Sequence, residues 1–211
     1  KSSIGFKNSY IRKKGSDFKK GEKIKINKII SAKELLLLAS MGYKKFQVYK
    51  KLKISILSVG NELIKPGQKI ERNKIYASNA HGIAGLLNNF LCECKIMPIS
   101  SDKISSIKKN LNNALKFSDI IITSGGASVG NYDLVKTAVQ KLGFENYFEN
   151  INIKPGKPTF AGLLKKTPLI GLPGNPVSSY VCAQLFIIPL IKNLFSIYPN
   201  KQKKSFAKLN S

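Results

Sequence analysis

The loop Lys154-Pro155-Gly156-Lys157-Pro158 holds the side chains whose spacing most clearly suggests chemistry. Two prolines and a glycine restrict the backbone around two ammonium groups, so little conformational entropy is lost when these lysines hold a ligand. A fixed pair of cations suits a dianionic group such as phosphate. The alternative is an ordinary lysine-bearing turn in a chain that contains 36 Lys+Arg residues.

Two acidic residues could supply the oxygen ligands that Mg²⁺ prefers. Glu62 follows the apolar run at residues 54–59, and Asp133 opens a helix-like run. At the carboxyl edge of one sheet, the two carboxylates could share a cation. Each also has a simpler explanation, Glu62 as an ordinary loop glutamate and Asp133 as a carboxylate that stabilises the positive end of a helix dipole.

The segment at residues 124–130 reads Ser-Gly-Gly-Ala-Ser-Val-Gly and lies between a strand-like run and a helix-like run. Glycines let backbone N–H groups approach an oxyanion closely, and the N-terminus of a helix adds a favourable potential for negative charge. The pattern therefore predicts a loop that binds phosphate or a similar anion. Tight packing of the turn is the competing explanation.

Alternating strand-like and helix-like runs must position these loops. Strands are predicted at 54–59, 94–99, 119–124, 159–164 and 169–172, with a further strand that ends at 153. Helices are predicted at 78–91, at 102–116 with Asp102 as cap, and from residue 131 or 132 to 142. A last helix begins with Asn175 as N-cap and Pro176 at its first position. The alternation predicts a three-layer α/β/α domain with a mainly parallel sheet over residues 51–196. Ligands then belong at the carboxyl ends of the strands.

The leading residues 1–50 have no evident core of their own and are interpreted as part of a smaller linker domain. Ser31 and Glu34 form a capping box that opens a helix through Ala39, and short β-like runs at 24–26 and 46–49 flank it. After the apolar run that ends near residue 195, the chain becomes polar. Residues 197–211 are interpreted as the start of a truncated β-rich domain.

The formal net charge of +25 comes almost entirely from lysine. Specific nucleic-acid readout favours arginine, and only Arg12 and Arg72 are present, so we interpret the lysines as a solvated surface that attracts small anions. The apolar run at 177–191 is shorter than a membrane span and is predicted to be a buried core helix. We therefore predict an anionic small-molecule partner, no specific nucleic acid and no membrane.

Lone reactive side chains offer little alternative chemistry. Cys92, Cys94 and Cys182 lack the spacing of a zinc site and indicate core packing in a reducing compartment. His81 is the only histidine and is interpreted as a solvent-facing or packed residue rather than a catalytic base. Covalent catalysis through a Ser-His or Cys-His arrangement is therefore disfavoured.

Five motifs follow one another across about residues 51–195. They are Ser58-Val-Gly-Asn-Glu-Leu63, Ser78-Asn79, Ile122-Thr-Ser-Gly-Gly-Ala-Ser-Val-Gly130 with Asp133, Lys154-Pro-Gly-Lys-Pro158, and Leu172-Pro-Gly-Asn-Pro-Val-Ser178. This series resembles the molybdopterin molybdotransferase family, which includes the E domain of gephyrin. The leading segment from Tyr10 to Phe18 is similar to the linker segment of that family.

The resemblance implies that the whole protein takes adenylylated molybdopterin and molybdate, releases AMP, and leaves molybdenum on the dithiolene sulfurs. It implies catalytic roles for Asp17, Glu62, Asp133, Lys154 and Lys157, with Mg²⁺ held by Glu62 and Asp133. The residues that it implies in substrate binding are Ser78, Asn79, Ser124, Gly125, Gly126, Ser128, Gly130, Pro173, Asn175 and Pro176.

The chain also departs from the family pattern. Members usually carry Arg-Asp before the Ser-Asn pair, where this chain has Tyr76-Ala77. The family's opening segment with its acidic DGYA-like motif and most of its C-terminal β-rich domain are expected to be missing here.

The resemblance further implies a cytoplasmic protein, a homodimer when full length, and a molybdopterin adenylyltransferase as a partner. Two other functions stay open. The chain could be a molybdopterin adenylyltransferase or a related nucleotide hydrolase, which share the α/β domain, or a non-catalytic pterin-binding or scaffold domain.

Overall fold

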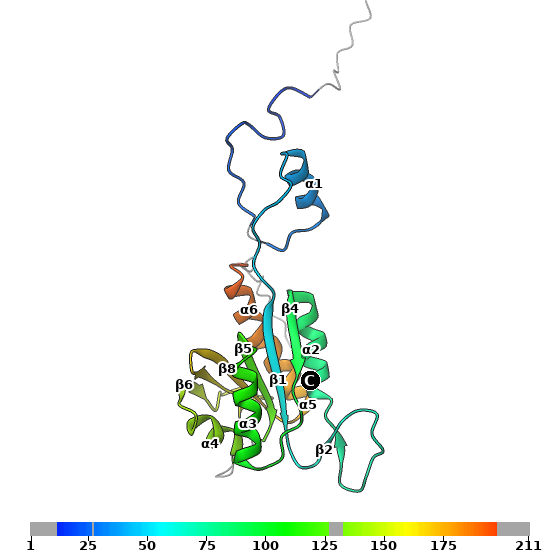
Figure 1. The fold of residues 1–211 in the computed structure, drawn as a ribbon, viewed down its shortest axis with the longest axis vertical. Helices are drawn as coiled ribbons and strands as arrows, with labels where there is room; N and C mark the ends of the chain where they lie inside the picture. The colour runs from blue at the N-terminus through cyan, green and yellow to red at the C-terminus, as the bar shows by residue number, and fades with distance from the viewer. Residues whose placement is uncertain (1–11, 27, 127–132, 198–211) are drawn as a thin grey trace, which may run out of the picture. The chain divides into compact units, whose positions relative to one another are not determined.

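The computed structural model describes residues 12–26, 28–126 and 133–197 (Figure 1). The chain divides into two units, residues 1–48 with 196–211 and residues 49–195, and each is described by itself. The first division lies two residues before the predicted boundary at 50/51.

A six-stranded sheet forms the centre of the second unit, in the order β4-β1-β5-β8-β7-β6. Its strands are β1 Leu52–Val59, β4 Cys92–Ile96, β5 Ile120–Gly125, β6 Phe144–Glu149, β7 Phe160–Leu164 and β8 Thr167–Leu172. The first four strands in the sheet order run parallel, and β7 and β6 are antiparallel to their neighbours. The predicted α/β fold with a mainly parallel sheet is confirmed.

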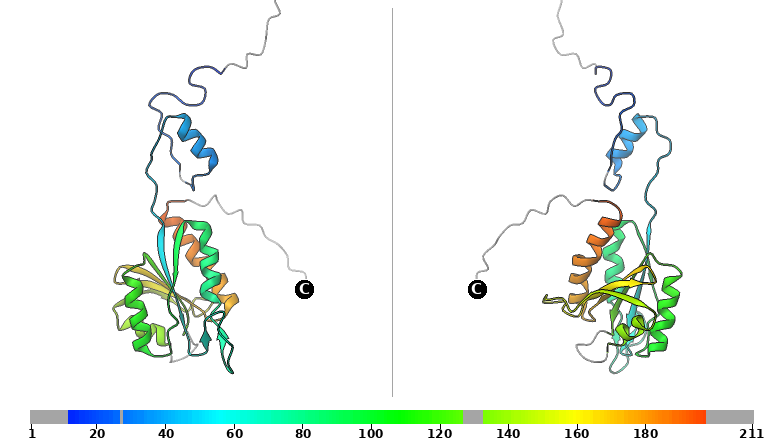
Figure 2. Two further views of the ribbon diagram at one scale, coloured as in Figure 1. Left: turned by 45° about the vertical axis from the view of Figure 1, so that its right-hand side comes forward. Right: turned by 90° about the vertical axis from the view of Figure 1, so that its left-hand side faces the viewer.

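Helices cover both faces of this sheet (Figure 2). One face carries α3 Ile104–Leu115 and α4 Leu134–Gln140, and the other carries α2 Asn79–Leu87, the short helix η1 Asn88–Phe90, α5 Pro176–Cys182, the π-helical turn η2 Ala183–Ile187 and α6 Ile188–Leu194. Alternation along β1 explains the two cores: Leu57 and Val59 pack with α3 and α4, whereas Ile54 and Ile56 point the opposite way, and all four are fully buried.

Between β1 and α2 the chain forms a small parallel pair, β2 Leu63–Ile64 and β3 Ile75–Tyr76. The segment that carries β2 and β3 is joined to the rest of the domain by hydrogen bonds between Asn61 and Asp102. The Asn61 N–H donates to Asp102 Oδ2 at 2.9 Å, and the Asp102 N–H donates to Asn61 Oδ1 at 3.1 Å. The prediction that Asp102 caps α3 is wrong, because its carboxylate is taken by this distant partner and Lys103 occupies the N-cap position.

Several other predicted elements have different limits. The strand predicted at 94–99 is β4 at 92–96, and the helix predicted at 78–91 is α2 followed by η1. The strand expected to reach residue 153 ends at Glu149, where β7 ceases to provide a partner. Helix α4 begins at Leu134, and the predicted start at residue 131 or 132 lies outside the described residues.

In the first unit, the capping box of Ser31 and Glu34 is confirmed at the start of α1, Ala32–Ser40. The β-like runs at 24–26 and 46–49 are not strands among the described residues, which offer them no neighbouring strand. An extended segment without a hydrogen-bonded neighbour forms no ladder.

The continuous helical stretch Pro176–Leu194 is long and apolar enough to cross a membrane by length and composition alone, with a mean hydropathy of 1.4. One face of it packs on the sheet through Cys182, Ala183, Ile187 and Ile191. The opposite face exposes apolar side chains such as Leu185. The prediction of a buried core helix therefore holds for one face only.

Candidate functional site

The strand register brings four loops to one edge of the sheet. Parallel strands β1, β5 and β8 end together, with Val59 opposite Gly125 and Ser124 opposite Leu172. Strand β7 runs the other way and its first residue, Phe160, lies opposite Gly171 near the end of β8. The lysine-bearing loop that precedes β7 therefore reaches the same edge as the loops after β1, β5 and β8.

A cavity of ≈ 460 Å³ opens at this edge, at the point where the chain crosses from one side of β1 to the other. This volume lies within the range of small-molecule sites in proteins. The predicted site residues that line it are Glu62, Ser78, Asn79, Ser124, Gly125, Asn175 and Pro176. Leu63, Ile75 and Tyr76 of the β2–β3 pair provide an apolar side to the same cavity.

Asn79 and Ser124 connect the elements around the cavity. The side-chain amide of Asn79 donates to Ser124 Oγ at 2.9 Å and to the Gly174 carbonyl at 2.7 Å. The buried Ser124 hydroxyl donates to the Pro173 carbonyl at 3.2 Å, and its oxygen lies 3.3 Å from Ser179 Oγ. Helix α2, strand β5 and the loop before α5 are thus fixed to one another. Ser179 was not predicted, because the motif considered ended at the preceding serine.

Gly125 is required by both conformation and space. Its φ of +85° is strained for any residue with a side chain, and a Cβ there would lie 2.4 Å from the Val59 carbonyl oxygen. Gly126 follows with φ +68° against Val59 and Val135. The predicted contacts Ser128 and Gly130 lie outside the described residues.

The two predicted metal ligands lie in different surroundings. Glu62 is exposed at the cavity, with its carboxylate folded over Gly60. Asp133 does not line this cavity and is the N-cap of α4, where its Oδ1 accepts the Lys136 N–H at 2.9 Å and its Oδ2 lies 3.9 Å from Lys136 Nζ. Burial raises the pKa of Asp133, against the opposing effect of these contacts.

No group of three or more His, Cys, Asp or Glu side chains converges on a possible ion within the described part of the chain. The Lys136 ammonium near Asp133 also lies 3.2 Å from Glu149 Oε2. Both oxygens of Asp133 thus already have a partner within the domain.

The lysine-bearing loop packs against α5. Gly156 is buried, and a Cβ on it would lie 2.4 Å from Cys182 Sγ. The Thr159 N–H and hydroxyl donate to the Gly156 carbonyl at 3.0 and 2.7 Å. Lys154 and Lys157 project from this braced turn as exposed side chains and do not line the cavity itself.

Residues 55–193 match the model of a family described as a probable molybdopterin binding domain. The chain belongs to this molybdopterin-binding domain family. It is 37% identical over 188 residues to a molybdopterin molybdenumtransferase of Haemophilus influenzae. This alignment covers 89% of this chain and 46% of the relative. It is also 37% identical over 156 residues to the molybdenum cofactor synthesis protein cinnamon of Drosophila melanogaster, covering 74% of this chain and 26% of that protein.

Solved structures agree with this membership of the molybdopterin-binding domain family. The molybdopterin biosynthesis MoeA protein of Pyrococcus horikoshii is similar with a TM-score of 0.74 and 30% identity, over 81% of this chain and 42% of that one. A MoaB protein of Thermus thermophilus shares the fold with a TM-score of 0.51 at 19% identity, over 70% of this chain and 98% of that one. The chain spans less than half the length of the Haemophilus and Drosophila relatives that it matches.

Asp17 belongs to the first unit and not to the molybdopterin-binding domain. Its carboxylate pairs with Arg12 at 2.6 Å, and both side chains are exposed. Its predicted role at the site stays a prediction.

Tyr76 and Ala77 stand where members of the molybdotransferase family usually carry Arg-Asp, and both residues line the cavity.

Proposed function

We propose that the full-length protein inserts molybdenum into the pterin cofactor, taking adenylylated molybdopterin and molybdate and releasing AMP. The observation that carries this proposal is the convergence of Glu62, Asn79 and Ser124 on one cavity, with the lysine-bearing loop at the same sheet edge. It is supported by membership of the molybdopterin-binding domain family and by relatives named molybdopterin molybdenumtransferase. The net charge of +25 favours the approach of such anions.

Each loop has a distinct proposed task. The backbone around Gly125, which approaches Val59 closely, holds a phosphate of the pterin substrate at the end of β5. Lys154 and Lys157 hold phosphate or molybdate oxyanions, since two ammonium groups on a braced turn are already in position for a dianion. Asn79 and Ser124 keep the walls of the cavity in register, and Ser78, Asn175 and Pro176 contact the bound substrate.

The Glu62 carboxylate and the phosphate oxygens of the substrate together form a donor set that suits Mg²⁺. A magnesium ion in such sites is commonly held by one or two carboxylates together with phosphate groups. Glu62 is exposed at the cavity, whereas both oxygens of Asp133 are engaged with Lys136. When bound, the ion would neutralise the charge of the phosphoanhydride. Asp133 as a second ligand stays a prediction.

We further propose a cytoplasmic homodimer that receives its substrate from a molybdopterin adenylyltransferase. Exposed apolar side chains on α5, η2 and α6, such as Leu185, are available to pack against other parts of a longer chain.

The decisive experiment uses the full-length protein and measures AMP released from adenylylated molybdopterin with and without molybdate. The unmodified protein should release AMP in a molybdate-dependent manner. Lys154→Ala and Lys157→Ala should raise the molybdate concentration needed for half-maximal release about tenfold, the effect of losing roughly 1.4 kcal/mol.

Lys165→Ala is the matched control. Lys165 lies in the turn between β7 and β8, where Leu164 faces Thr167, and is therefore at the opposite edge of the sheet. This variant removes the same charge at the other end of β7 and should leave AMP release unchanged. Equal effects of the two sets of variants would contradict a specific anion site, and no AMP release at all would favour a scaffold.

A further inference from the structure

The turn from Gly156 to Thr159 carries Lys157 and is closed by two hydrogen bonds from one residue, Thr159. The Thr159 N–H donates to the Gly156 carbonyl at 3.0 Å, and the Thr159 hydroxyl donates to the same oxygen at 2.7 Å. A carbonyl oxygen has two lone pairs, so the two donors together can satisfy it fully. Lys157 directly follows Gly156, and its backbone position therefore depends on how firmly these bonds close the turn.

Gly156 is the residue of this turn that most needs to be held. Its φ is +124°, and a Cβ on it would clash with Cys182 Sγ and lie 2.8 Å from Ile153 Cδ1. The close approach of the turn to α5 therefore requires glycine, which has the greatest backbone freedom of any residue. A second hydrogen bond to the Gly156 carbonyl removes part of that freedom.

Thr159 is itself held by the sheet and by α5. It is 0% exposed and directly precedes β7, whose first residue Phe160 lies opposite Gly171 of β8. The Asn150 N–H, just after β6, donates to the Thr159 carbonyl at 3.1 Å, and Thr159 Oγ1 lies 3.3 Å from Cys182 Sγ. The Thr159 hydroxyl is therefore a fixed point from which the turn can be held in place.

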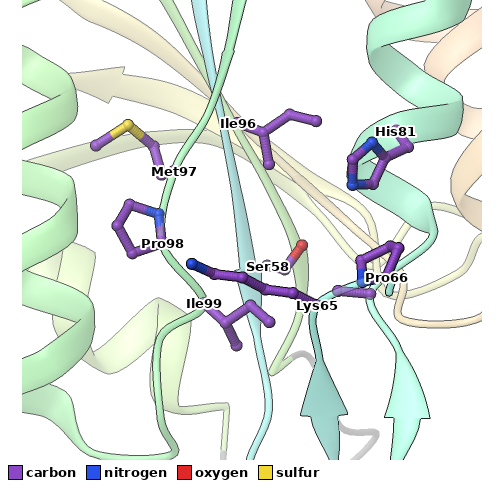
Figure 3. A pocket seen from close by; sticks show the side chains of 9 residues that line it. Ser58, Lys65, Pro66, His81, Ile96, Met97, Pro98 and Ile99 are labelled. Carbon is purple, nitrogen blue, oxygen red and sulfur yellow. The ribbon is translucent and has the colours of Figure 1, made fainter. Parts of the chain in front are cut away.

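Thr159 lies apart from the cavities at the edge of the sheet. It lines neither the cavity of ≈ 460 Å³ nor a second cavity of ≈ 340 Å³ between residues 96–99 and α2. Figure 3 shows this second cavity, whose basic side chains are Lys65 and His81. An effect of the buried Thr159 hydroxyl on the binding of an anion must therefore pass through the turn that carries Lys157.

We propose that Thr159 is the positioning residue of Lys157. Its hydroxyl keeps Gly156 in the conformation that holds the Lys157 ammonium ready for a tetrahedral oxyanion such as molybdate. This role rests on the proposed function, which assigns anion binding to Lys157. A ligand that binds one conformation of a protein has an apparent affinity reduced in proportion to the population of that conformation. Loss of the hydroxyl lowers this population and so weakens binding, while the ligand-bound turn stays the same.

The first test titrates the 211-residue chain with molybdate at fixed ionic strength and follows the backbone amide signal of residue 157 by NMR spectroscopy. Thr159→Val removes the hydroxyl, nearly keeps the shape of the side chain and retains the N–H that closes the turn. It should raise the dissociation constant for molybdate at least fourfold, as expected if the binding conformation falls to about a quarter of the population. Thr159→Ser keeps the hydroxyl and should stay within twofold of the unmodified chain.

Ser55→Ala is the matched control for the loss of a buried hydroxyl group. Ser55 lies in β1, and its Oγ accepts a hydrogen bond from the Ser118 hydroxyl at 2.5 Å. This variant should lose stability in urea denaturation, as Thr159→Val does, but keep the dissociation constant for molybdate within twofold. A rise of less than fourfold in folded Thr159→Val protein, or an equal rise in Ser55→Ala or Thr159→Ser, would overturn the proposal in favour of a purely structural role.

The second test asks whether Thr159 acts through Lys157, with a double-mutant cycle read by the same titration. Residues that act through a shared interaction have non-additive effects, whereas independent residues have effects that multiply. If the hydroxyl serves to place the Lys157 ammonium, adding Thr159→Val to Lys157→Ala should raise the dissociation constant by less than a further twofold. A larger further rise in the double variant would show independent contributions and overturn the proposal.

Measurements on the full-length protein separate this inference from the proposed function. Thr159→Val should raise the molybdate concentration for half-maximal AMP release at least fourfold and leave the rate at saturating molybdate within twofold. Molybdate-dependent AMP release with an unchanged half-maximal concentration in Thr159→Val would count against the role of Thr159 alone. Molybdate binding that depends on Thr159 and Lys157, without any AMP release, would count against the proposed reaction alone.

Discussion

At the amino end of the central sheet, two residues that precede β5, Phe117 and Asp119, contact the neighbouring strands β1 and β4. The Lys53 N–H donates to Asp119 Oδ2 at 2.8 Å, and the Asp119 N–H donates to the Lys53 carbonyl at 2.7 Å. The ammonium groups of Lys53 and Lys95 lie 5.2 and 5.1 Å from the centroid of the Phe117 ring. At the carboxyl end, longer loops follow the strands, and Asn79 at the start of α2 joins Ser124 of β5 to the Gly174 carbonyl of the loop before α5. Cavities remain between these longer loops, so the same sheet has one end suited to stability and one suited to ligands.

The largest effect on stability should come from Gly125→Ala at the carboxyl end. The strain of a left-handed residue and the clash of Cβ with the Val59 carbonyl should together lower the free energy of unfolding by about 3 kcal/mol. Gly143→Ala is the control at the amino end, because Gly143 has a similar φ of +82° but nothing within 4 Å of its missing Cβ. It should cost about 1 kcal/mol in urea denaturation. Equal costs would show that space around Gly125 is unimportant.

The next effect concerns turnover. In the full-length protein, Glu62→Gln should lower AMP release about 100-fold, or roughly 2.7 kcal/mol, because it removes the charge proposed to hold Mg²⁺. Asp119→Asn, at the other end of the sheet, should leave release unchanged and lower the free energy of unfolding by about 1 kcal/mol. Loss of turnover in both variants would contradict the functional distinction between the two ends.

A smaller effect is expected at Asp133. Asp133→Ala removes the N-cap of α4 and should lower stability by about 1 kcal/mol, whereas Asp133→Asn keeps a capping oxygen and should not. Because burial raises the pKa of Asp133, the folded state holds its proton to higher pH than the unfolded state does. Stability from this group therefore falls as pH rises between the two pKa values, and Asp133→Asn should abolish that dependence in urea titrations.

AMP release separates the capping role of Asp133 from a metal role. A cap alone predicts that full-length Asp133→Asn releases AMP within about threefold of the unmodified protein, which is the outcome we expect from its contacts with Lys136. A fall of tenfold or more at saturating Mg²⁺, with stability unchanged, would instead support the second metal ligand that the sequence predicted.

The smallest effect concerns Cys92 at the start of β4. Burial and the neighbouring Cys94 raise the pKa of Cys92 to about 12. Its thiolate should therefore amount to about 1 part in 10,000 at pH 8, and alkylation by iodoacetamide should be far slower than in urea-unfolded protein, as read by peptide mass spectrometry. The unfolded thiol ionises first, so stability should decline as pH rises above about 9. Rapid alkylation of folded protein would contradict this burial.

Sequence reasoning succeeded where a structure depends on adjacent residues. The capping box of Ser31 and Glu34 and the N-cap of Asn175 require only a side chain and the next turn of backbone. Continuous apolar strands likewise predicted a covered parallel sheet. The assignment of Asp102 as a cap failed because Asn61, 41 residues away, competes for the same carboxylate.

The sequence predicted which residues form the site better than it predicted how those residues are arranged in space. Motifs placed Glu62, Asn79 and Asn175 among the site residues, and all three line one cavity. The separation of Asp133 from that cavity depends on how loops fold across the sheet, and so does the position of Ser58 and Ala77, which line both that cavity and a second one of ≈ 340 Å³. Spacing along the chain carries no information about such contacts.

The reversed direction of β7 has a practical consequence for protein engineering. The two residues Lys165 and Lys166 connect β7 and β8 in an exposed turn, at the end of the hairpin farthest from the Lys154–Lys157 loop. Sequence inserted into a solvent-exposed turn is tolerated better than sequence inserted where strands must pair. A fluorescent reporter or affinity tag placed between Lys165 and Lys166 should leave the register of Phe160 opposite Gly171, and with it the approach of the lysine-bearing loop, intact.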